Sequence, residues 1–107
     1  MGKKTRQEGI MRIPIISERT DEVWVSFRHV LRRSDKIGAF TEATVMWTPP
    51  DGILKQAVAV ARVHPNDAPE RRIGRKVALA RALWLAGFPR DERRQVWMEL
   101  IKRGMRV

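Results

Sequence analysis

Residues 22–31 read EVWVSFRHVL, and their side chains alternate in character from one position to the next. On an extended backbone, successive side chains point to opposite faces. One face would carry Val23, Val25, Phe27, His29 and Leu31, and the other Trp24, Ser26, Arg28 and Val30. A period of two indicates a β-strand with one buried face. We therefore predict a strand over Glu22–Leu31.

Two more strands are predicted downstream, separated by short polar segments. Residues 40–47 are rich in Thr, Val and aromatic side chains, which favour a strand. Residues 48–52 read TPPDG, a strong turn signal, and residues 55–63 give a third strand. Connections this short predict an antiparallel meander. The third strand places alanines on one face, where a helix could pack closely: Ala57, Ala59 and Ala61.

A helix is predicted after the third strand. Asp67 is a suitable N-cap, Glu70 three residues later completes a capping-box pattern, and Pro69 fits the first turn. The helix should run to about Ala86, with Gly87 as its C-terminal stop. Its expected core stripe, at helical spacing, is Ile73, Val77, Ala80 and Trp84.

A final helix, from about Asp91 to Arg103, should cover Leu79 and Leu83 of the first helix and end at Gly104. Its inward side chains would be Val96, Trp97, Leu100 and Ile101. The predicted order is β-β-β-α-α. This is an α+β domain in which two helices pack on one face of a three-stranded antiparallel meander.

The domain is expected to span residues 12–107, preceded by a flexible basic tail over residues 1–11. The tail is too polar to bury much surface. Residues 11–16 could form a short extended piece, which Pro14 would keep at a sheet edge.

Charge is the most unusual property of the composition. The chain has 22 Lys and Arg against 12 Asp and Glu, a net charge of +10. Such a protein attracts polyanions, above all nucleic acid. The chain has no cysteine, which excludes disulfides and thiolate sites. Its apolar runs, such as 57–61, are too short to cross a bilayer, so we expect a cytoplasmic protein with no membrane partner.

The cations concentrate where the first helix begins. Helix starts carry partial positive charge, so cations there are unfavourable unless an anion such as phosphate is nearby. Gly74 would let a phosphate backbone approach closely. The predicted nucleic-acid-binding residues are Arg71, Arg72, Arg75, Lys76 and Gly74, with Lys3, Lys4 and Arg6 adding diffuse attraction from the tail. The patch could extend to Arg62, Arg90, Arg93 and Arg94.

Two further contacts are predicted from the strands. Trp24 shares its face with Ser26 and Arg28, so it could stack on an exposed base if that face is solvated. The third strand is short and apolar, which would allow edge-to-edge homodimerisation.

Catalytic chemistry is poorly supported. The two histidines, His29 and His64, do not make a zinc site with Asp67. Pro50-Asp51 superficially resembles the start of a nuclease motif, but residues 56–63 contain no carboxylate to complete a Mg²⁺ site. We therefore predict no catalytic residue, no metal and no cofactor.

Two resemblances add to this reading. Three strands followed by a basic helix start resemble, in topology only, the double-stranded-RNA-binding domain, whose helix grips phosphates. Residues 63–67, 74–82 and 93–99 (VHPND, GRKVALARA, RRQVWME) are similar to small proteins encoded by tailed bacteriophages. That likeness implies a viral accessory protein for genome handling or for disabling host defences, as anti-CRISPR proteins do.

The expected function is therefore non-enzymatic binding of DNA or RNA through phosphate contacts. The alternative is a protein-binding inhibitor of a host machine, acidic or nucleic-acid-processing, such as a CRISPR effector or RNA polymerase. A small metal-dependent nuclease is the third hypothesis.

Overall fold

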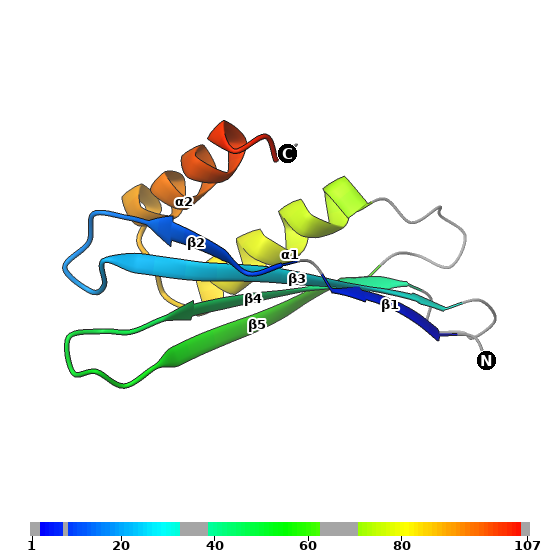
Figure 1. Ribbon diagram of the computed structural model, residues 1–107, viewed down its shortest axis with the longest axis horizontal. Coiled ribbons are helices and arrows are strands. Elements are labelled where there is room, and N and C mark those ends of the chain that lie inside the picture. Colours follow the sequence, from blue (N-terminus) through cyan, green and yellow to red (C-terminus); the bar gives the residue numbers. More distant parts are fainter. Residues whose placement is uncertain (1–2, 8, 33–38, 63–70, 106–107) are drawn as a thin grey trace.

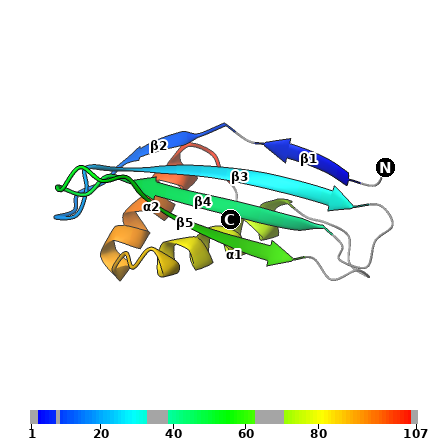
Figure 2. The same ribbon diagram turned by 90° about the horizontal axis from the view of Figure 1, so that it is seen from below.

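The computed structural model describes residues 3–7, 9–32, 39–62 and 71–105, with the backbone alone for 3–7 and 31–32. An antiparallel β-sheet forms one layer and two helices form the other (Figures 1 and 2). The elements are β1 Lys3–Gln7, β2 Met11–Pro14, β3 Glu22–Arg32, β4 Phe40–Trp47, β5 Lys55–Arg62, α1 Arg71–Leu85 and α2 Arg90–Lys102. The α+β class is confirmed. The predicted number of strands was wrong, because five strands and not three pair in the sheet within the described residues.

The predicted meander is β3-β4-β5, and the two additional strands lie along the outer side of β3. β2 pairs with the first part of β3, with Pro14 opposite Glu22 at its end, as an edge proline requires. β1 pairs with the last part, Lys3 lying opposite Arg32. A flexible tail over residues 1–11 was therefore the wrong prediction for residues 3–7. β3 is longer than β2, so the last part of β3 has backbone N–H and C=O groups left to pair with a further strand, β1. The polar composition of residues 1–11 gives no sign of this pairing.

The core lies between the sheet and the helices. Val23, Val25 and Phe27 of β3 are buried on the covered face, as their alternation predicts. Ala59 and Ala61 of β5 are buried on the same face, where α1 packs on β4 and β5. The alanines leave room for that close approach.

Helix α1 is rotated about its axis from the predicted orientation. Its buried residues are Gly74, Ala78, Leu79, Ala82 and Leu83. The predicted core stripe was wrong for Ile73, which is 52% exposed, for Trp84, which is 70% exposed, and for Ala80, which is also exposed. Only Val77 of that stripe packs against the core, where it is half-buried. The helix is apolar on more than one side, and the side with the smallest residues faces the sheet because it brings the two layers closest.

Gly74 lies at a close approach between α1 and the sheet. A Cβ built on Gly74 would lie 2.3 Å from Thr41 Oγ1 and 2.9 Å from Thr41 Cβ. Real side chains do not approach so closely. The glycine is therefore required by the contact between α1 and β4.

The helix ends follow the predicted stops, with φ of +79° at Gly87 and +96° at Gly104. The end of α1 is also held by Arg19, whose guanidinium donates hydrogen bonds to the carbonyls of Ala86 and Gly87. The same guanidinium lies 4.5 Å from the ring centre of Phe88. The capping residues predicted at the start of α1, Asp67 and Glu70, lie outside the described residues.

Candidate nucleic-acid interface

Positive charge is concentrated in the helical layer. Residues 71–103, which span both helices, contain ten of the chain's 22 Lys and Arg but only three of its 12 Asp and Glu. Helix α1 has five cations and no carboxylate. The helical layer is therefore the part of the described chain best suited to attract a polyanion.

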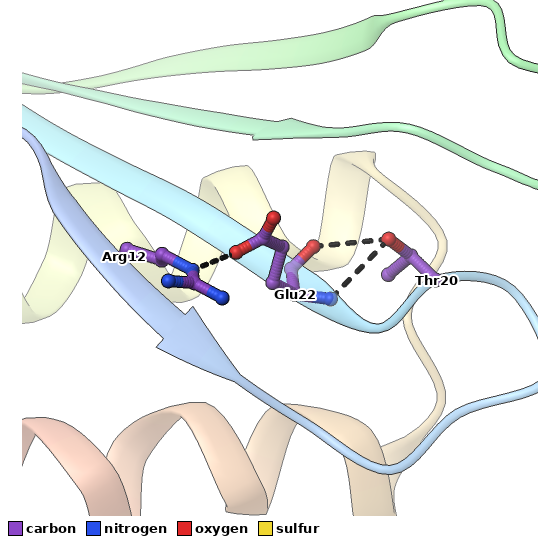
Figure 3. Close-up of polar contacts among 3 residues, drawn as sticks. All are labelled: Arg12, Thr20 and Glu22. Atoms are coloured by element: carbon purple, nitrogen blue, oxygen red, sulfur yellow. Dashed lines mark hydrogen bonds and ion pairs between the residues drawn. The ribbon is translucent and has the colours of Figure 1, made fainter.

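Two arginines on the uncovered face of the sheet are paired with carboxylates. Arg12 is hydrogen-bonded and ion-paired to Glu22, whose backbone carbonyl accepts a 3.0 Å hydrogen bond from the Thr20 hydroxyl (Figure 3). Arg28 lies 3.3 Å from the carboxylate of Glu42. The carboxylates offset the charge of both arginines.

The first turns of α1 bring most of the predicted binding residues together. Arg71, Arg72 and Lys76 are exposed there. Arg75 is half-buried and lines a cleft of about 520 Å³, whose other lining residues come from 9–11, from β3 and from the end of α2 with the residues after it. These four cations therefore share the end of the helical layer where α1 begins.

A cation that the sequence did not single out lines the same cleft. Figure 2 shows α1 and α2 diverging from the turn that joins them, and Arg103, directly after α2, lines the cleft together with Arg75. Phe27 and Leu100 contribute apolar walls. Nothing local in the sequence identifies Arg103, because only helix packing brings it near α1. We call the set Arg71, Arg72, Arg75, Lys76 and Arg103 the basic face.

Charge around the cleft is reduced by one carboxylate. Arg103 Nε donates a 2.8 Å hydrogen bond to Glu99 Oε2. That hydrogen bond, reinforced by the charges of Arg103 and Lys102, lowers the pKa of Glu99 below its ordinary value. Glu99 is therefore ionised at neutral pH and orients the Arg103 guanidinium at the rim of the cleft.

Gly74 does not serve the role predicted for it. Gly74 is buried on the side of α1 that faces the sheet, against Thr41, so a phosphate backbone cannot approach it. The prediction was wrong because the missing side chain faces the sheet and not solvent. Gly74 contributes to the site only indirectly, by setting how close the cations of α1 lie to the sheet.

The other predicted cations are not gathered at the basic face. The backbone of Lys3, Lys4 and Arg6 lies in β1, and the structure does not describe their side chains. Arg62 ends β5 on the uncovered side of the sheet, where its guanidinium carbon lies 5.8 Å from the ring centre of Phe40. A second cationic hollow, of about 660 Å³, surrounds the start of α2 and is lined by Arg90, Asp91, Arg93, Arg94, Trp97 and Met98.

Trp24 lies on the uncovered face of the sheet, opposite Arg12 on β2 and Met46 on β4, and it is 37% exposed. It is therefore accessible to a ligand, and its stacking on a base stays a prediction. His29 is buried, with its Nδ1 2.9 Å from Thr41 Oγ1.

Within the described residues, no group of three or more His, Cys, Asp or Glu is placed to hold a metal ion. Asp51, the carboxylate of the nuclease-like pair, accepts a 2.9 Å hydrogen bond from the backbone N–H of Ile53. No helix in the described part of the chain is long and apolar enough to span a membrane.

Comparison of the chain with protein-family models, curated proteins and solved structures finds no match.

Proposed function

We propose that this protein binds nucleic acid through phosphate contacts made by the basic face, without catalysing a reaction. The observation that carries the proposal is the exposure of Arg71, Arg72 and Lys76 on a helix with no carboxylate. Phosphates bound there would relieve the unfavourable interaction between these cations and the helix dipole. Arg75 and Arg103 would add contacts from the cleft that both line.

The proposal predicts a steep dependence on salt. Each duplex-DNA phosphate neutralised contributes about −0.9 to the slope of log K against log[salt], so four or five contacts give a slope of roughly −4. Fluorescence anisotropy with labelled duplex DNA, duplex RNA and single-stranded DNA, each at several salt concentrations, would measure it. The preferred probe would then distinguish the three kinds of nucleic acid.

A matched pair of variants tests which face binds. Replacing Arg71 and Lys76 with Ala should weaken binding and make the slope of log K against log[salt] shallower by about 1.8, which corresponds to the loss of two phosphate contacts. Replacing Arg12 and Arg62 with Ala removes the same charge from the sheet and should change the slope little. Equal losses from both double variants would refute the assignment to the basic face, as would absence of binding or binding that ignores salt.

A second candidate is a protein-binding inhibitor of a host machine. The specific observation in its favour is the 70% exposure of Trp84 beside Leu85, which is 59% exposed. Large exposed apolar side chains in a group mark protein contacts more often than phosphate contacts. Pull-down from host lysate with and without nuclease treatment separates the two functions, because a partner held through nucleic acid is released by nuclease.

A further inference from the structure

The outer surface of α1 carries a row of apolar side chains that the fold leaves largely uncovered. The row comprises Ile73, Ala80 and Trp84, which are exposed, and Val77, which is half-buried against the core; we call it the apolar strip. Ile73 and Trp84 are 52% and 70% exposed. Single exposed apolar residues are ordinary, but a row at helical spacing is the pattern of a packing face. The strip therefore indicates that α1 packs against something more than the sheet.

A hollow beside the strip provides a place for an incoming side chain. It has a volume of about 580 Å³ and lies between α1 and β5. Its lining residues are Ala59, Val60, Ala80, Arg81, Trp84 and Leu85. The lining combines small alanines with the Trp84 indole, so the hollow suits large aliphatic side chains anchored against an aromatic ring.

The edge of the sheet narrows the choice of partner. No strand pairs with the outer side of β5 among the described residues. Arg81 Nη1, however, donates a 2.8 Å hydrogen bond to the carbonyl oxygen of Val60 on that edge. An added strand would have to displace Arg81 to reach this carbonyl. The contact disfavours strand addition, including the predicted edge-to-edge homodimer, and favours a helical partner.

The charges around the strip specify the partner's chemistry. Because successive helix residues are rotated by about 100°, Arg72 and Lys76 flank the strip on one side and Arg81 on the other. Two copies packed strip to strip would bring these cations together, and each chain carries a net charge of +10. A partner with acidic residues beside its apolar stripe would pair with them.

We propose that the apolar strip and its hollow bind an amphipathic helix of another protein, one whose apolar stripe is flanked by Asp and Glu. This goes beyond nucleic-acid binding, since Ile73, Trp84 and the hollow have no part in phosphate contacts.

A labelled synthetic peptide tests the proposal directly. The probe is an amphipathic helix with a leucine stripe flanked by glutamates, and its binding is followed by fluorescence anisotropy. Two control peptides have the same leucines in scrambled order, or lysines in place of the glutamates. The acidic amphipathic peptide should bind the full chain at least tenfold more tightly than either control. The scrambled peptide loses the apolar anchors, and the lysine peptide loses the charge complementarity with the cations beside the strip.

Two exposed-residue variants locate the site. Trp84→Ser should weaken binding of the acidic peptide by roughly tenfold or more, because an aromatic anchor is lost. Met98→Ser, at a residue of α2 that is 57% exposed, should leave it unchanged. Both variants should keep the wild-type circular dichroism spectrum and the wild-type affinity for duplex DNA.

Three results would overturn the proposal. The first is absence of peptide binding, or equal binding of the scrambled peptide. The second is an equal loss of affinity in both variants. The third is a wild-type dimer in sedimentation equilibrium that Trp84→Ser converts to monomer, because a second copy would then cover the strip.

Discussion

The contact between Gly74 and Thr41 makes a quantitative prediction about stability. At an unhindered helix position, Gly→Ala stabilises a protein by about 1 kcal/mol. In Gly74→Ala the new methyl would start 2.3 Å from Thr41 Oγ1. Ordinary contact is about 3.5 Å or more, so α1 or β4 would have to move by about 1 Å. We therefore expect this substitution to destabilise the fold.

The size of the effect follows from two opposing contributions. Overpacking of a core typically costs about 1–3 kcal/mol. The shift would also disturb the 2.9 Å contact between Thr41 Oγ1 and His29 Nδ1, a hydrogen bond of about 1 kcal/mol. The gain in helix propensity, about 1 kcal/mol, offsets roughly the cost of the disturbed hydrogen bond. The free energy of unfolding should therefore fall by about 1–3 kcal/mol in total. For a domain of this size, each kcal/mol lowers Tm by about 4–8 °C.

Urea unfolding followed by circular dichroism would measure the change. Ala80→Gly, at an exposed position of the same helix, calibrates propensity and should cost about 1 kcal/mol. Thr41→Ala should partly rescue Gly74→Ala, since the 2.3 Å contact disappears and the 2.9 Å contact to Cβ remains. Thr41→Ser keeps the Oγ1 and should not rescue. A more stable Gly74→Ala variant would refute the close contact and return Gly74 to a solvent-facing role.

Further variants test the other contacts. Arg19→Ala should lower the free energy of unfolding by about 2–3 kcal/mol in urea titrations, because two charged hydrogen bonds to the end of α1 and the contact with Phe88 are lost; a change below about 0.5 kcal/mol would contradict that role. Glu99→Gln should reduce stability by its full amount above pH 4.5, the ordinary Glu pKa, and by progressively less as pH falls from there through the lowered native pKa, because the ionised form is then no longer populated; melts across the acid range should converge at low pH, and a difference that persists there would exclude Glu99 ionisation as its source. Arg81→Ala should keep the free energy of unfolding within about 0.5 kcal/mol of wild type. It should nevertheless promote self-association in sedimentation velocity, because it uncovers the Val60 carbonyl on the sheet edge. A variant that stays monomeric at every concentration would show that Arg81 does not protect the edge.

Much of the fold could be predicted because its signals are local. The alternation over residues 22–31, the turn at 48–52 and the stops at Gly87 and Gly104 depend on side chains and backbone angles within a few residues. Strand β1 had no such signal, since its pairing depends on the free outer side of β3.

The candidate site was predictable only in part. The cluster of cations at the start of α1 is visible in the sequence, and the structure leaves Arg71, Arg72 and Lys76 exposed. Arg103 could not be found, because the angle between α1 and α2 brings it to the cleft. Gly74 was misread, because a glycine near cations fits a phosphate contact as well as it fits tight packing.

The sequence by itself determined the α+β order, the covered face of β3 and the excess of positive charge, since these depend on composition and on periods of two and 3.6 residues. Only the tertiary structure decided which side of α1 meets the sheet. That helix is apolar on more than one side, so its periodicity allows several orientations. Close packing selects the side with Gly74, Ala78 and Ala82 because small residues let the layers approach. This choice leaves Trp84 in solvent and gives the protein the surface on which the proposed partner helix would bind.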